Sequence, residues 1–320
     1  MTHTDPQYDT LIDAQTWEFI KQTEKWYPAD TIDFSMQTQR TVYDTMCREF
    51  HTGYPNGISA ADDTIETNDC NIPVRRYTSA DSNNTALLIY FHGGGYVVGG
   101  LESHDDVCAE ICATTGLSVT AVDYRLAPEH LHPAAFNDSL ASVVYEYQRT
   151  SLPLILCGDS AGGNLAAAVC HTLRDSDTLP DIEIAGQVLI YPALGGDISE
   201  GSYVTHAKAP CLTTRDVQFY TRIRTGNRAP DNVVSLAPLL DTSFANLPET
   251  VALSAECDPL ADDGRDYVAA ICDAGGKAVW LHEKGLIHGY LRARHTVDRA
   301  RDSFTRITNA IGQMAVGLRG

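Results

Sequence analysis

Short runs of strand-forming residues alternate with segments of helical period from about residue 84 onwards. Parallel strands need long crossover connections, which are usually helices, so this alternation predicts a mostly parallel central sheet flanked by helices. Six runs are expected to form the parallel strands, at residues 86–92, 117–123, 154–158, 187–191, 251–255 and 278–282. Two earlier runs, near residues 64–68 and 72–78, predict antiparallel strands at the start of the sheet.

Two stretches fall outside this alternation. Residues 1–60 contain an apolar stripe at helical spacing, formed by Val42, Met46 and Phe50. The second stretch, at about 197–225, contains a helix that Thr214 is expected to cap. We therefore expect N-terminal cap helices at 1–60, and a main α/β domain at 61–320 with a cap insertion at about 197–225. The alternative is that the N-terminal helices only pack on the flank of that domain.

The chain is strongly acidic, with 42 Asp and Glu against 23 Lys and Arg and a net charge of -19. Such a charge repels nucleic acid and anionic membranes, and it disfavours a strongly anionic substrate. No apolar run in the sequence approaches the roughly 20 residues needed to span a bilayer. We therefore expect a soluble monomer or homodimer with no nucleic-acid and no membrane partner.

The first residues lack the basic start and apolar stretch of a secretory signal, which predicts a cytoplasmic protein. The nine cysteines are odd in number and form no C-x-x-C pair, so we expect free thiols that act as small core residues. Cys108 and Cys112 lie one helical turn apart, but no histidine joins them at metal-ligand spacing. No metal and no cofactor are expected.

A G-x-S-x-G sequence, residues 158–162, stands directly after the apolar run that ends at Cys157 and before a helix-forming segment. Small residues on both sides allow the tight strand-to-helix turn that exposes a serine hydroxyl, and the helix that follows directs its positive end at the site. In this context the motif predicts that Ser160 is a nucleophile.

The sequence His92-Gly93-Gly94-Gly95 follows the first predicted parallel strand. Glycines leave backbone N–H groups accessible, and two or three such donors are what a tetrahedral oxyanion requires. We assign the oxyanion hole to the amides of Gly94, Gly95 and Ala161. A phosphate-binding loop is the alternative, but no G-K-[ST] follows and no G-x-G-x-x-G fingerprint is present.

A serine nucleophile needs a base and a group that orients the base, in the chain order serine, acid, histidine for this arrangement. His282, His288 and His295 come late enough in the chain. His282 is expected to end a strand and His295 to lie in a helix, whereas His288 is expected in a loop at the carboxyl edge of the sheet, where such sites assemble. We therefore predict that His288 is the base.

Asp258 follows the strand predicted at residues 251–255 and precedes Pro259, so it is expected at the same edge of the sheet. Glu256 lies too close to the end of that strand. Asp262, Asp263 and Asp266 are expected in the next helix, where acids in the first turn simply stabilise the helix. The predicted acid is Asp258.

With these residues assembled, the chain resembles the hormone-sensitive-lipase-like family of bacterial esterases, over about residues 70 to 310. The resemblance is carried by YFHGGGYVVGGLESHD, VDYRLAPEH, CGDSAGGNLAAA, CDPL and LIHGY. It implies an α/β-hydrolase fold and a cap built from the N-terminal helices and a mid-chain insertion. It also implies that Asp159 and Asn164 lie beside the nucleophile, and that Tyr124 and Arg125 support the site.

The predicted reaction is hydrolysis of a small-molecule ester through an acyl-enzyme on a Ser-His-Asp triad, with a preference for short acyl chains. The alternatives are an amidase or formamidase on the same fold, or a non-catalytic ligand-binding protein on this scaffold. Asp159 is expected to take part in substrate binding, and four aromatic residues are expected to narrow the pocket: Tyr96, Tyr203, Phe219 and Tyr220.

Overall fold

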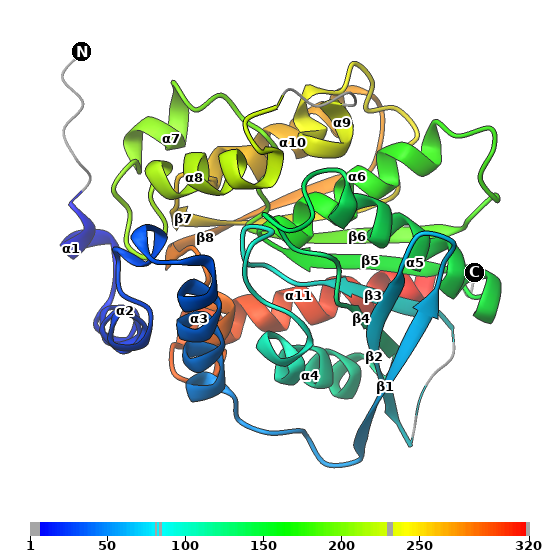
Figure 1. The fold of residues 1–320 in the computed structure, drawn as a ribbon, viewed down its shortest axis with the longest axis horizontal. Coiled ribbons are helices and arrows are strands. Elements are labelled where there is room, and N and C mark those ends of the chain that lie inside the picture. Colours follow the sequence, from blue (N-terminus) through cyan, green and yellow to red (C-terminus); the bar gives the residue numbers. More distant parts are fainter. Residues whose placement is uncertain (1–6, 81, 83–84, 229–232, 318–320) are drawn as a thin grey trace.

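The computed structural model describes residues 7–80, 82, 85–228 and 233–317, and an eight-stranded sheet lies at its centre (Figure 1). The strands are ordered β1-β2-β4-β3-β5-β6-β7-β8. β2 is antiparallel to both β1 and β4, and all other pairs are parallel. The strands are β1 Ile58–Glu66, β2 Asn71–Ser79, β3 Leu87–Phe91, β4 Ser118–Val122, β5 Leu154–Asp159, β6 Ile184–Ile190, β7 Thr250–Cys257 and β8 Ala278–Ile287. The predicted mostly parallel sheet is confirmed.

The last strand is longer than predicted. β8 continues to Ile287, so His282 lies inside it, and His288 lies in the short turn between this strand and the helix that begins at Tyr290. Gly285 has a φ of +67° and lies where the pairing of β7 with β8 shifts register. Glycine is typical of loops, so the sequence indicated that the strand ends before Gly285. Glycine also occurs at bulges inside strands, and here the strand continues through it.

Helices cover both faces of the sheet (Figure 1). One face is covered by α4 (Asp105–Thr115) and α11 (Asp298–Gly317), and the other by α5 (Ala134–Thr150), α6 (Ala161–Arg174) and α10 (Ala261–Asp273). Because the central strands are buried on both sides, β3 is buried at all five positions, with alternate residues entering the two cores. Continuous apolar runs are the pattern expected of such strands.

The remaining α-helices are short or lie outside the two layers. They are α1 (Tyr8–Leu11), α2 (Ala14–Trp26), α3 (Met36–Phe50), α7 (Gly201–Thr205), α8 (Thr214–Thr225) and α9 (Val233–Leu236). Figure 1 shows α2 and α3 on the left side of the sheet, with α7 and α8 above them. The cap of α8 is Thr213, one residue before the prediction, and Thr213 forms a capping box with Asp216. None of the described helices is both long enough and apolar enough to cross a membrane.

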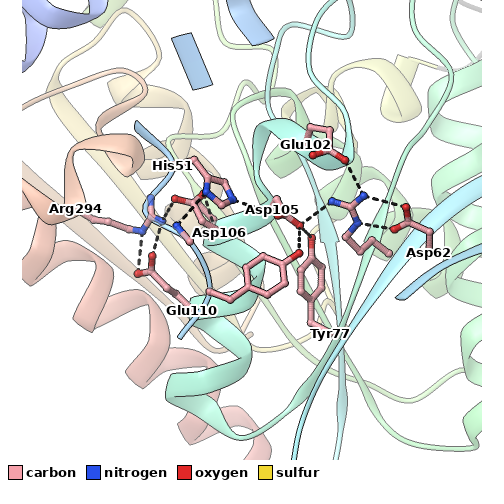
Figure 2. Close-up of polar contacts among 12 residues, drawn as sticks. His51, Asp62, Tyr77, Glu102, Asp105, Asp106, Glu110 and Arg294 are labelled. Carbon is pink, nitrogen blue, oxygen red and sulfur yellow. Dashed lines mark hydrogen bonds and ion pairs between the residues drawn. The ribbon is translucent and has the colours of Figure 1, made fainter. Parts of the chain in front are cut away.

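A polar network ties the segment after α3 to the sheet (Figure 2). Asp105, at the start of α4, accepts hydrogen bonds from the hydroxyls of Tyr54 (2.6 Å) and Tyr77 (2.7 Å) and from Arg75 Nη1 (2.9 Å). His51 Nε2 lies 3.2 Å from the same carboxylate. Burial raises the pKa of Asp105, but these four donors outweigh it and lower the pKa overall.

The cysteines are free thiols in the structure. Six of the nine are buried and Cys70 is partly buried, which fits the expectation of small core residues. Cys211 and Cys272 are exposed, so that expectation is wrong for these two.

Candidate active site

Ser160 stands at the turn between β5 and α6 with a φ of +55°, a conformation that non-glycine residues rarely adopt. The flanking glycines make this turn possible. A Cβ atom on Gly162 would lie 1.9 Å from the carbonyl oxygen of Phe91, and one on Gly158 would lie 2.4 Å from the carbonyl carbon of Gly162. The G-x-S-x-G sequence is therefore required by the close approach of β3, β5 and α6 around the serine.

The structure brings Ser160, Asp258 and His288 together. His288 Nε2 lies 2.9 Å from Ser160 Oγ, and His288 Nδ1 lies 2.7 Å from Asp258 Oδ2. Asp258 is fully buried, and its other carboxylate oxygen accepts from the backbone N–H of Leu260 (2.9 Å). Since the carboxylate can only accept, Nδ1 carries the proton, and Nε2 is free to accept the serine proton.

The glycine loop after β3 faces the serine. Gly94, Gly95 and Ala161 line the same cavity as Ser160 and His288. Gly94 and Gly95 have positive φ values of +123° and +60°. Side chains would not fit at either position, because a Cβ on Gly94 would lie 2.1 Å from the Val98 carbonyl oxygen.

Asp159 anchors this loop. Its side chain is buried and accepts hydrogen bonds from the Gly93 N–H (2.9 Å) and the Tyr90 hydroxyl (2.8 Å), and His104 Nε2 lies 3.2 Å away. Burial raises the pKa of Asp159, but the neighbouring His104 and, more weakly, Arg292 favour the carboxylate, so that the pKa is lowered overall. Asp159 lines the cavity, and its hydrogen bonds serve the glycine loop.

Residues that the resemblance implied as supports surround the loop and the turn. Tyr124 donates to the His92 carbonyl (2.6 Å) and stacks on the His92 ring at 4.2 Å. Burial, reinforced by His104, lowers the pKa of His92 to about 4, so the ring is neutral at neutral pH. Asn164 donates to the Ala193 carbonyl (2.8 Å). Arg125, in contrast, pairs with Asp138 at 2.7 Å and is not among the residues that line the cavity.

The cavity over Ser160 is lined by segments from distant parts of the chain. Its walls include α2 and α3 residues such as Phe19, Tyr43 and Met46, and α8 residues such as Val217 and Tyr220. The Tyr27 and Tyr220 hydroxyls lie 2.9 Å apart and join the N-terminal segment to α8. The Tyr220 ring lies directly over Gly95, where an added Cβ would be 2.5 Å from the ring.

Three of the aromatic residues expected in the pocket are not among those that line the cavity: Tyr96, Tyr203 and Phe219. Tyr96 is buried beneath the Arg224 guanidinium, 3.6 Å from its ring centroid. The Tyr203 hydroxyl donates to Asp263 (3.2 Å), and Phe219 packs edge-on against Tyr220. Of the aromatic residues predicted for the pocket, Tyr220 alone lines it.

Asp263 lies in the first turn of α10, as predicted. It is buried, however, so its role is not simply that of an exposed acid that stabilises the start of a helix. Its Oδ2 accepts from the backbone N–H groups of Leu194 (2.6 Å) and Gly195 (3.0 Å), in the loop after β6, while Oδ1 has no partner. Burial raises its pKa to about 7, against the effect of these amides. Its contacts indicate a role in holding that loop, whose Ala193 N–H donates to the Ser160 carbonyl (3.3 Å).

The sequence reasoning missed Arg292, Tyr27 and Tyr43, which also line the cavity. Arg292 stands four residues after His288, and this proximity to the predicted base was the available signal. Nothing local marked Tyr27 or Tyr43, because their position depends on how α2 and α3 pack against the sheet.

One group of side chains outside the cavity has metal-ligand chemistry. Ligand atoms of Asp106, Glu110 and His295 lie within 4.8 Å of one another. Figure 2 shows that Arg294 reaches into this group, and its Nη2 lies 2.6 Å from both carboxylates. The guanidinium therefore already supplies the positive charge that a cation would bring.

Residues 88–292 match a protein family described as having the alpha/beta hydrolase fold. The carboxylic ester hydrolase LipN of Mycobacterium tuberculosis is 36% identical over 232 residues, which cover 69% of this chain and 61% of LipN. The esterase LipI of the same organism is 35% identical over 236 residues, covering 72% of this chain and 73% of LipI.

Solved structures of esterases have the same fold. A hyperthermophilic esterase from the archaeon Pyrobaculum calidifontis superposes with a TM-score of 0.84 at 28% identity, covering 96% of this chain and 99% of that one. An ester hydrolase from the metagenome of Lake Arreo superposes with a TM-score of 0.86 at 27% identity, covering 97% of this chain and all of the other (100%). The similarity therefore extends over the N-terminal helices as well as the sheet.

Proposed function

This chain belongs to the alpha/beta hydrolase family, and we propose that it is a carboxylic ester hydrolase that acts on short acyl esters through Ser160. The observation that carries the proposal is the continuous hydrogen-bonded series from Ser160 Oγ to His288 Nε2 (2.9 Å) and from His288 Nδ1 to Asp258 Oδ2 (2.7 Å). The family to which the chain belongs, with relatives named as ester hydrolases, supports the same reaction.

In the proposed mechanism, His288 Nε2 accepts the Ser160 proton while Oγ attacks the ester carbonyl carbon. The tetrahedral intermediate collapses when His288 returns the proton to the leaving alcohol, which leaves the acyl group on Ser160. Water then attacks this acyl-enzyme by the same proton transfers, releasing the carboxylic acid. Asp258 holds the imidazole in the Nδ1–H tautomer and stabilises the imidazolium at each step.

The developing oxyanion is stabilised by the amides of Gly94, Gly95 and Ala161, which border the cavity beside Ser160. Ala161 is the first residue of α6, so its N–H is one of the free donors at the positive end of that helix. Preorganised donors of this kind usually contribute more to acyl transfer than any other single effect. Asp159 contributes indirectly by fixing the loop at Gly93 (2.9 Å).

The proposed preference for short acyl chains rests on the walls of the cavity. Residues of α2, α3 and α8 form its walls, and the hydrogen bond between Tyr27 and Tyr220 (2.9 Å) closes one side. We propose that these helices act as the cap over the sheet. Each methylene that fits gains about 0.8 kcal/mol from burial, whereas one that does not fit must displace packed side chains.

We also propose that the enzyme works in the cytoplasm, as a monomer or homodimer, on a small ester. The nine free cysteines support a reducing compartment, in which thiols persist without pairing. The net charge of -19 supports a protein that avoids nucleic acid and anionic lipid surfaces.

A fluorophosphonate probe and the variant Ser160→Ala test the function together. The wild-type protein should be labelled at one serine and should hydrolyse p-nitrophenyl butyrate, and the variant should lose the label and about six orders of magnitude in kcat. An unchanged thermal unfolding temperature would show that the variant is folded. A wild-type protein that takes no label and hydrolyses neither esters nor amides would indicate a ligand-binding protein instead.

A further inference from the structure

Arg292 is the only lysine or arginine among the described residues that line the catalytic cavity. It stands four residues after His288, on the short helix η4 (Tyr290–His295) that follows Gly289. The proposed acyl transfer does not use it, because the triad and the backbone amides supply all the groups that the reaction needs.

The Arg292 guanidinium has no acidic partner in the part of the chain that the structure describes. It donates to the Tyr43 hydroxyl, and its Nε is buried without a hydrogen-bond partner. Buried arginines are usually paired with carboxylates. Arg294, two residues later, is an example, because its Nη2 lies 2.6 Å from carboxylate oxygens of both Asp106 and Glu110. Arg292 is half-buried, and a guanidinium that is partly withdrawn from water without an ion-pair partner destabilises the folded protein, so Arg292 is an unusual group to keep at this position.

None of the acids in the described cavity wall forms an ion pair with Arg292, although Asp159 attracts it weakly from a distance. Asp216 is engaged in the cap of α8, where its Oδ2 accepts from Thr213 N (2.8 Å) and Oγ1 (2.7 Å). Asp159 is held by the glycine loop, and Glu24 is exposed. Other side chains that interact with Arg292 are neutral: the Cys47 thiol and the tyrosines Tyr27, Tyr43 and Tyr191.

A carboxylate on a bound ligand would supply the missing countercharge, because Arg292 lines the cavity and a guanidinium presents a planar set of donors that matches a carboxylate. We propose that Arg292 is a specificity residue that selects esters carrying one carboxylate in addition to the ester group, on the acyl chain or on the alcohol. This inference rests on the ester-hydrolase function proposed above. One guanidinium balances the charge of one carboxylate. Because the protein has a net charge of -19, a ligand with more negative charge would be repelled.

Two substrate pairs test the inference and identify the side that Arg292 contacts. Ethyl hydrogen succinate and ethyl succinamate differ only in an acyl-side carboxylate and its neutral amide. Acetoxyacetate and acetoxyacetamide differ in the same way on the alcohol side. Hydrolysis is monitored by titrating the released acid. The quantity compared is the ratio of kcat/KM for the charged ester to kcat/KM for its neutral partner.

In at least one pair, Arg292→Met should lower this ratio by at least about tenfold, the usual effect of losing a hydrogen bond to a charged group. Arg292→Lys should lower this ratio less, because lysine keeps the positive charge but lacks the planar pair of N–H donors that a guanidinium offers to a carboxylate. Arg222→Met, on the exposed side of α8, should leave the ratio unchanged. A ratio that changes less than about threefold in both pairs would overturn the inference, since a purely structural role affects the charged and neutral esters equally.

A measurement on the wild-type enzyme covers the case in which Arg292→Met does not fold. Succinamate should inhibit the hydrolysis of p-nitrophenyl butyrate at a concentration at least about tenfold lower than succinamide does. Equal inhibition by the two would overturn the inference while the ester-hydrolase function stands. Failure of the wild-type protein to hydrolyse any of the esters would overturn both.

Discussion

At the scale of single residues, the site depends on a few backbone conformations that the surrounding structure holds in place. Ser160 keeps a φ of +55°, and Gly94 keeps a φ of +123° in the loop that faces it. Such conformations persist where packing over-determines them, and here β3, β5 and α6 meet around the two segments. The groups proposed to be catalytic are thereby held in position in the structure without a ligand, which is what electrostatic preorganisation requires.

Asp263 gives a residue-scale prediction about pH. Its pKa is raised to about 7 by burial, against an ordinary value of 3.8. Below about pH 4 the folded and unfolded chains both carry the proton, whereas between about pH 4 and 7 the unfolded chain releases a proton that the folded chain keeps. The contribution of Asp263 to stability should therefore be complete in acid and be lost as the pH rises through 7.

The measurement is the free energy of unfolding of the wild-type protein and of Asp263→Asn, from urea titrations between pH 4 and 8. Between pH 4 and 8, the free energy of unfolding of the wild type should fall by up to about 4 kcal/mol relative to that of Asp263→Asn. Each unit of difference in pKa between the folded and unfolded chains corresponds to about 1.4 kcal/mol. Asp266→Asn, an exposed acid on the same helix, is the control and should show no such trend. A difference that is flat with pH would show that Asp263 is a carboxylate in the folded protein throughout.

At the scale of elements, α8 forms part of the cavity wall above the glycine loop. Tyr220 lies over Gly95 and bonds to Tyr27, whereas Phe219, its neighbour on α8, is not part of the cavity wall. Adjacent residues on a helix point in different directions, so the rotation of α8 decides which ring enters the cavity.

Tyr220→Ala should therefore move the acyl-length optimum. For p-nitrophenyl esters from acetate to palmitate, the wild-type enzyme is expected to have its highest kcat/KM at about two to six carbons, since longer chains must displace packed side chains. Removal of the Tyr220 ring should shift this maximum to longer chains, and Phe219→Ala should leave it in place. Identical profiles for all three proteins, or a wild-type maximum at ten carbons or more, would contradict the closed cavity.

At the scale of the whole molecule, the surplus of acidic residues acts on stability. A net charge of -19 produces self-repulsion in the folded state that is felt over long distances at low salt. Surface ion pairs such as that between Arg215 and Asp33 (2.8 Å) oppose it, but exposed pairs contribute only about 0–1 kcal/mol each. We therefore expect the repulsion between acidic groups to outweigh the attraction within these pairs.

Raising sodium chloride from about 10 mM to 0.5 M should consequently increase the thermal unfolding temperature by a few degrees, because the screening length falls from roughly 30 Å to below 10 Å. Differential scanning calorimetry at constant pH measures this directly. A temperature that stays constant or falls with salt would mean that the ion pairs outweigh the repulsion.

The sequence by itself determined the parallel strands and the three residues that meet at the carboxyl edge of the sheet. This was possible because local rules apply there: alternating strands and helices leave few topologies, and a turn as tight as that at Ser160 requires glycine at residues 158 and 162. The end of β8 was misplaced because Gly285, at a register shift, reads as a loop signal.

Only the tertiary structure decided which side chains line the cavity over Ser160. Tyr220 lines the cavity and Tyr203 does not, although both lie in the predicted insertion, and Asp263 is buried although it stands in the first turn of a helix. Arg292 gained its place in the cavity from the packing of η4 against α3. These positions depend on the rotation and docking of helices far apart in the chain, and such contacts leave no local pattern in the sequence.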